Sequence, residues 1–134
     1  MIDHIILTVS DFERSVAFYT KALKPLGITN FIDYEGHPGH PDLKGFGDRK
    51  RAFFWLKKGK PDPRAVHVGF VAKDHAEVDA FYKVALKAGG KSKKRLNLGP
   101  NTILAIMRHG CSILTATISR SFIRANAAGR RSSN

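Results

Sequence analysis

The sequence predicts one α+β domain made of two tandem βαβββ modules, which form a cupped mixed sheet with helices on its outer face. The first observation is an internal repeat: residues 3–27 align without gaps on residues 66–90, and nine of the 25 positions are identical. The second is the composition of the 134 residues, 43% hydrophobic and 25% charged, which is ordinary for a globular domain with one core. We place module 1 at about 1–60 and module 2 at about 64–123.

The first module begins with a strand over residues 2–9, because IDHIILTV is short, β-branched and bounded by polar residues. Ser10 and Glu13 have the spacing of a capping box and predict the start of a helix. Its apolar residues recur at a helical period, and Gly27 is the stop signal. Three strand candidates follow, at 30–36, near 43–47 and at 51–58.

The second module repeats this order from a strand at 66–72. Asp74 and Glu77 form its capping box, and Gly89-Gly90 ends its helix. The remaining strands must come from 96–122, where a turn at His109-Gly110 predicts a hairpin. Residues 124–134 are predicted to be a disordered basic tail, which leaves 1–123 as the domain.

Several classes of protein are excluded at this point. No apolar run approaches the roughly 18–20 residues of a membrane span, so no membrane partner is expected. The N-terminus lacks the basic region and cleavage site of a signal peptide. Cys111 is the one cysteine and cannot form an internal disulfide, which is typical of a cytoplasmic protein.

The net charge of +12 is concentrated in the last third of the chain. Residues 1–90 hold 14 Lys/Arg and all 11 Asp/Glu, a net +3, whereas residues 91–134 hold 9 Lys/Arg and no acid, a net +9. The segment KSKKR at 91–95 could contact phosphate. It has neither a nucleic-acid-binding fold nor interleaved aromatics, so we interpret it as a solvated linker and expect no nucleic-acid partner.

A tandem βαβββ repeat with a histidine on the first strand of each copy resembles the vicinal oxygen chelate superfamily, which includes glyoxalase I, bleomycin-resistance proteins and extradiol dioxygenases. The resemblance rests on DHIILTVSDFERSVAFYTKALKPLG, FFWLKKGKPD and VHVGFVAKDHAEVDAFYKVALKAGG, within residues 1–91. It implies a cup that holds a divalent metal ion (Zn, Ni, Mn or Fe) and a small-molecule substrate. His4 and His67 match the two family histidines and are the predicted metal ligands. Family members usually pair as homodimers.

The third ligand in that family is usually a glutamate on the last strand, inside a stretch like DPDGHNIE. This chain has no carboxylate after Asp79, and catalytic metal sites usually need three protein ligands. The resemblance therefore implies a glyoxalase-like or dioxygenase-like metalloenzyme, of lactoylglutathione-lyase or dioxygenase type, that the missing glutamate would leave inactive. The alternative is a metal-free protein of bleomycin-resistance type that binds a small ligand. No catalytic residue is assigned.

The missing acids have an explanation at the level of the gene. Residues 98–123 can be back-translated and read in a shifted frame, in which each new codon takes the third base of one codon and the first two bases of the next. This frame permits the peptide RAQYHPSYYAAWLLDPDGHNIEVVH. Many first bases are free choices, but the second and third are mostly fixed. This peptide resembles the family's C-terminal hairpin with its glutamate. We hypothesise that a one- or two-base shift near Ser92–Arg95 has replaced the native C-terminus.

Strand alternation predicts where the two histidines point. His4, Ile6 and Thr8 should share one face of their strand, and His67, Gly69 and Val71 the equivalent face of theirs. The intervening residues should then face the helices.

Weaker candidates lie elsewhere in the first module. His37 and His40 could form a second metal site, although a Pro/Gly-rich turn over the cup mouth is the favoured interpretation. Asp33 or Glu35 could supply a substitute carboxylate. Residues 53–55 (FFW) could line a substrate pocket, but alternation makes part of this set core, and the sequence does not say which part.

Overall fold

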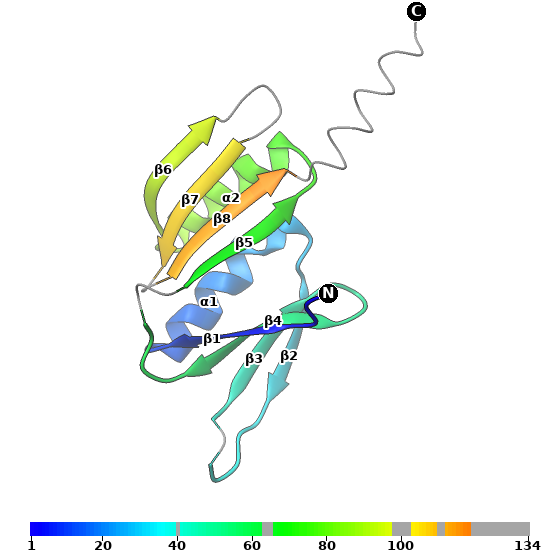
Figure 1. Cartoon of the computed structure of the whole chain (residues 1–134), viewed down its shortest axis with the longest axis vertical. Coiled ribbons are helices and arrows are strands. Elements are labelled where there is room, and N and C mark those ends of the chain that lie inside the picture. The colour runs from blue at the N-terminus through cyan, green and yellow to red at the C-terminus, as the bar shows by residue number, and fades with distance from the viewer. Residues whose placement is uncertain (40, 63–65, 98–102, 110–111, 119–134) are drawn as a thin grey trace, which may run out of the picture.

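The computed structural model describes residues 1–39, 41–62, 66–97, 103–109 and 112–118 (Figure 1). The predicted α+β class is confirmed. The elements follow in the order β1 (Ile5–Val9), α1 (Phe12–Ala22), the 3-10 helix η1 (Lys24–Leu26), β2 (Asn30–Tyr34), β3 (Leu43–Gly47), β4 (Ala52–Lys58), β5 (His67–Ala72), α2 (His75–Lys87), β6 (Lys91–Asn97), β7 (Ile103–His109) and β8 (Ser112–Ile118).

The strands form two four-stranded sheets with matching connectivity. The first has the order β1-β4-β3-β2 and the second β5-β8-β7-β6. Strand β1 pairs in parallel with β4, and β5 pairs in parallel with β8. The other pairs are antiparallel. The edge strand β1 therefore directly follows His4, and the edge strand β5 begins at His67.

Each helix starts at an aspartate, and the two aspartates are repeat-related. The Asp74 side chain accepts a hydrogen bond from the Glu77 backbone N–H at 2.9 Å, as its capping box predicts. In module 1 the capping-box prediction was wrong by one residue, because Asp11, and not Ser10, accepts from the Arg14 backbone N–H at 3.1 Å. The α-helix ends at Ala22, earlier than predicted. Gly27 instead caps the 3-10 helix η1, with a φ of 76° in the left-handed region that glycine tolerates.

The basic segment at 91–95 is not a linker. Its backbone lies within β6 and pairs with β7, so that prediction was wrong. Strand β6 begins at Lys91, before the predicted range of 96–122, because a run of lysines lacks the apolar alternation that indicates a strand. The hairpin prediction is confirmed by the β7–β8 pairing, in which His109 lies opposite Ser112.

Some predictions concern other parts of the chain. Cys111, His40 and the tail at 124–134 lie outside the described residues. Among the helices of the described residues, none has the length and apolarity that a membrane span needs.

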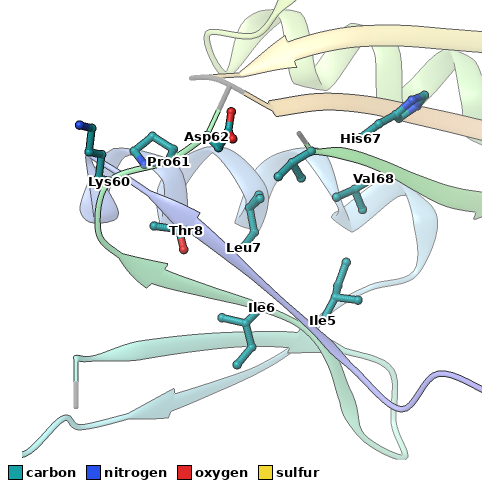
Figure 2. Close-up of a pocket in the computed structure, with 10 residues that line it drawn as sticks. Ile5, Ile6, Leu7, Thr8, Lys60, Pro61, Asp62, His67 and Val68 are labelled. Atoms are coloured by element: carbon teal, nitrogen blue, oxygen red, sulfur yellow. The ribbon is translucent and has the colours of Figure 1, made fainter. Parts of the chain in front are cut away.

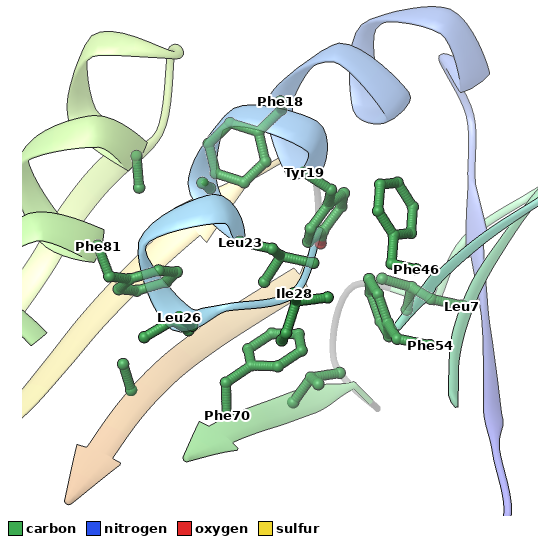
Figure 3. Close-up of a cluster of buried hydrophobic side chains, with 14 of the residues drawn as sticks. Leu7, Phe18, Tyr19, Leu23, Leu26, Ile28, Phe46, Phe54, Phe70 and Phe81 are labelled. Carbon is green, nitrogen blue, oxygen red and sulfur yellow. The ribbon is translucent and has the colours of Figure 1, made fainter. Parts of the chain in front are cut away.

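Both modules contribute to one hydrophobic core. Helices α1 and α2 contact each other, and the buried side chains on them pack with those from β1, β3, β4 and β5 (Figure 3). Phe54 of module 1 makes an edge-to-face contact with Phe70 of module 2, with ring centroids 5.3 Å apart, and a second one with Tyr19 at 5.1 Å. The core fixes the edges of the two sheets near each other.

The predicted alternation holds throughout β5 and only in part in β1, where Ile5, predicted to face the helix, is 38% exposed. Leu7 and Val9 are buried, whereas Ile6 is 48% exposed. In β5 the pattern is strict: His67, Gly69 and Val71 are exposed, and the residues between them are buried. His67 therefore belongs to the sheet face that turns away from the core, and His4, directly before β1, is exposed.

Candidate functional site

The gap between β1 and β5 contains two pockets that share Ile5 and Val68. The larger, which we call the His67 pocket, has a volume of about 430 Å³ (Figure 2). Its lining comes from β1, from the segment before β5 and from the start of β5 itself: Ile5, Ile6, Leu7, Thr8, Lys60, Pro61, Asp62, Val66, His67 and Val68. The pocket therefore combines apolar walls with a few polar groups.

The smaller pocket, which we call the His4 pocket, has a volume of about 180 Å³. Its lining is largely apolar and aromatic, and Asp3 and His4 are its titratable members: Ile2, Asp3, His4, Ile5, Phe53, Phe54, Val68, Gly69 and Phe70. This volume suits a group about the size of one aromatic ring.

The two predicted metal ligands line different pockets. The start of β1 borders Val68–Phe70, and the rest of β1 borders Val66–Val68, so the strands run in opposite directions along the gap. His4 and His67, each directly before one of the two shared residues, therefore line different pockets of the gap. Figure 2 shows the His67 ring projecting from β5 to the side opposite Val68.

His4 has a carboxylate partner. Its Nδ1 lies 2.7 Å from Asp3 Oδ2, and the other oxygen of Asp3 accepts from the Arg51 guanidinium at 2.6 Å. The hydrogen bond from His4, together with the nearby charge of Arg51, lowers the pKa of the Asp3 carboxyl and keeps it ionised. All three side chains are largely exposed, so the ion pairs add little to the free energy of folding.

Arg51 is held by the turn between β3 and β4. The Asp48 carboxylate accepts hydrogen bonds from the backbone N–H groups of Lys50, at 2.8 Å, and Arg51, at 3.2 Å. These two bonds lower the pKa of Asp48. The Asn30 side chain donates to the Asp48 carbonyl at 3.0 Å and ties the turn to β2.

The donor set of one chain does not fit a catalytic metal centre. His4 and His67 lie in separate pockets, and no three His, Cys, Asp or Glu side chains of the described residues come together. Such a centre usually needs three protein ligands on one ion.

The substitute carboxylates do not reach either histidine. Asp33 pairs with Lys44 at 2.7 Å, and the β-sheet register puts Lys44 beside the buried Leu56, on the face opposite Ile6 and Trp55. The suggestion that Asp33 supplies a ligand was therefore wrong. Glu35 follows β2 and lines neither pocket of the gap.

The HPGHPD loop forms a separate hollow of about 500 Å³ near the start of α1. Its lining is Phe12, Gly36, His37, Pro38, Pro41, Asp42 and Lys58. Asp42 stabilises the loop by accepting a hydrogen bond from the Gly36 backbone N–H at 2.7 Å. Of the predicted histidine pair, the described residue His37 lies here, away from His4 and His67.

An apolar row crosses the exposed face of the first sheet. The register aligns Ile6, Trp55, Gly45 and Ile32 from edge to edge. A Cβ atom on Gly45 would lie 2.8 Å from the Trp55 ring, so glycine is what lets the indole lie flat on the strand. Tyr34, 43% exposed, continues this surface in the next row. Phe54, by contrast, faces the core, so it is the core member of residues 53–55 that strand alternation did not identify.

The fold and the gap define a small α+β protein with a ligand-sized hollow between two repeated modules. The model of the Glyoxalase/Bleomycin resistance protein/Dioxygenase superfamily matches residues 1–114, and the chain belongs to this superfamily. None of the curated proteins matches.

Solved structures support the same fold. A glyoxalase/bleomycin resistance protein from Albidiferax ferrireducens has a TM-score of 0.70 at 23% identity, covering 89% of this chain and 98% of that one. A glyoxylase/bleomycin resistance protein/dioxygenase domain from Frankia sp. has a TM-score of 0.69 at 19% identity, with coverage of 90% and 98%. A lactoylglutathione lyase from Agrobacterium tumefaciens has a TM-score of 0.64 at 14% identity, with coverage of 90% and 95%.

Proposed function

We propose that the protein binds a small, largely apolar molecule in the gap between β1 and β5, without needing a metal ion. The observation that carries this proposal is that both pockets of the gap share Ile5 and Val68, so one ligand can occupy both. The His67 pocket, at about 430 Å³, is in the size range of small-molecule sites. The His4 pocket adds room for a ring.

The lining favours an apolar ligand with few polar groups. Phe53, Phe54 and Phe70 line the His4 pocket, and Thr8 and His67 lie in the other one. Apolar walls with a small number of polar groups are typical of sites for small molecules. The separation of His4 from His67 supports binding that does not depend on a metal.

A second candidate is a metalloenzyme of glyoxalase, lyase or dioxygenase type. One observation favours it: His4 and His67 are repeat-related, and both are exposed. Because the two histidines of one chain line different pockets, this candidate requires a second copy of the chain to bring two imidazoles and a further donor together.

Pairing of two copies is itself a proposal. Ile6, Ile32 and Tyr34 of the first sheet are 41–48% exposed, and Val71 of the second sheet is 66% exposed. Contiguous exposed apolar side chains often mark a protein interface. A homodimer would bury the apolar row around Trp55.

Ligand titration tests the main proposal. We expect toluene and phenol, as probes, to bind saturably to protein treated with EDTA, as followed by amide chemical shifts. Ile5→Trp fills the wall that both pockets share and should weaken binding at least about tenfold. Val71→Trp is the matched control, because Val71 lies on β5 but lines neither pocket. Equal effects of the two substitutions would contradict the site.

Metal analysis tests the second candidate. If it holds, purified protein contains zinc, nickel, manganese or iron, and both His4→Ala and His67→Ala lose it while His37→Ala does not. Substoichiometric metal in all four proteins would favour the metal-free function. Sedimentation at several protein concentrations reports whether the chain pairs.

A further inference from the structure

The carboxylate beside His4 determines which ring nitrogen carries the proton. An ionised carboxylate only accepts hydrogen bonds, so at 2.7 Å from Asp3 Oδ2 the Nδ1 atom of His4 must be the donor. A neutral imidazole has one protonated nitrogen, and the other is then an acceptor. The acceptor of neutral His4 is therefore Nε2.

The position of the Asp3 carboxylate is fixed from both of its oxygens. Oδ2 faces His4, while Oδ1 accepts from Arg51, which lies 48 positions further along the chain. Arg51 is in turn anchored by the Asp48 turn. An exposed ion pair adds little to the free energy of folding. The ratio of the two His4 tautomers, however, changes with a small difference in free energy, so the weak Asp3–Arg51 interaction is sufficient to shift it.

The residue directly before the histidine differs between the two modules. The residue that stands before His67, at the repeat position of Asp3, is Val66. The hydrogen bond is therefore no general consequence of a histidine at the start of this strand. It distinguishes the His4 end of the gap from the His67 end.

We propose that Asp3, held by Arg51, fixes His4 as the Nδ1–H tautomer, so that Nε2 accepts a hydrogen bond from a hydroxyl-bearing apolar molecule in the His4 pocket. The ligand half of this proposal rests on the proposed function. Asp3, the other titratable residue of the lining, already accepts from His4 and Arg51 through its two oxygens, and the remaining side chains are apolar. A buried hydroxyl therefore finds its acceptor in the imidazole, since an unpaired hydroxyl there is unfavourable. Asp3 and Arg51 are positioning residues.

The tautomer is tested without any ligand. In long-range ¹H–¹⁵N spectra at pH 8.5, where imidazoles are neutral, we expect His4 to be protonated at Nδ1. Asp3→Ala should shift His4 toward the Nε2–H form, and Arg51→Ala should do so in part. Asp33→Ala, which removes a carboxylate paired with Lys44, is the matched control and should change nothing. An Nε2–H tautomer in the wild type, or no response to Asp3→Ala, would overturn the proposal.

The ligand class is tested with phenol and toluene, which differ by a hydroxyl in place of a methyl group. We expect the wild type to prefer phenol by about threefold to tenfold, as one hydrogen bond provides. Asp3→Ala should remove this preference, so that phenol and toluene then bind with equal affinity. Equal binding of both probes to the wild type would contradict the hydrogen bond from the ligand to His4 Nε2, but not the proposed binding site. Binding of neither probe overturns the proposed function as well, while the tautomer spectra still decide the role of Asp3.

Discussion

His4 and His67 occupy the same position in the two repeats, yet they line different pockets of the gap between β1 and β5. The strands run in opposite directions along the gap, so equivalent residues separate as the modules pack. His4 also has a carboxylate partner, Asp3, whereas Val66 precedes His67. Repetition of the fold has therefore produced two chemically different sites.

The first prediction concerns the core that joins the modules. Phe54 is 1% exposed and contacts rings of both modules. Phe54→Ala should lower the free energy of unfolding by about 3–5 kcal/mol, because it removes a buried ring and leaves a cavity. Urea denaturation measures this. Phe31→Ala, at a ring that is 38% exposed, should cost about 1 kcal/mol; equal losses would show that Phe54 does not join the two modules.

The second prediction separates the two candidate caps of α1. Asp11→Ala should destabilise the protein by about 1 kcal/mol, since it leaves the Arg14 backbone N–H without its acceptor. Ser10→Ala should change stability by less than about 0.5 kcal/mol. Thermal unfolding of the two variants measures both values. The reverse order would restore the capping box that the sequence suggested.

The third prediction concerns acid. The pKa of Asp48 is lowered in the folded protein by the backbone N–H groups of Lys50 and Arg51. Its contribution to stability is therefore complete above about pH 4, the range of an unfolded aspartate, and is lost as the pH falls through the lower folded value. The amide shifts of Lys50 and Arg51 should titrate with a midpoint below that of a free aspartate. A midpoint at or above it would contradict these hydrogen bonds.

The fourth prediction concerns the gene. If a one- or two-base shift near Ser92–Arg95 has changed the C-terminal third, resequencing the DNA will find the base that restores the alternative reading. The restored chain would carry the DPDGHN turn and a glutamate after it. We expect that chain to bind zinc more tightly than this one, by isothermal titration. An uninterrupted reading frame, shared with related sequences that have the same tail, would refute the hypothesis.

Much of the fold could be predicted because the two copies of the repeat can be aligned directly in the sequence. Asp11/Asp74 and Phe18/Phe81 are identical pairs, and each pair has the same cap or core role in both helices. Strand β6 was missed because lysines hide the alternation on which strand prediction relies. The cap of α1 was assigned one residue early, since Ser10 and Asp11 are both good caps.

The site was less predictable than the fold. The histidines were found from the repeat, but their separation depends on how the modules pack, which no local pattern encodes. The contact between Asp3 and Arg51 joins residues 48 positions apart, and an isolated acid and base carry no signal of pairing. Asp3 stands directly before His4, and that adjacency was the one available indication.

A crystal structure of EDTA-treated protein soaked with toluene tests the central claim most directly. We expect the ligand to lie between Ile5 and Val68, with the imidazoles of His4 and His67 in different pockets and no ion between them. An empty gap, or the two imidazoles of one chain converging on a single bound ion, would contradict it.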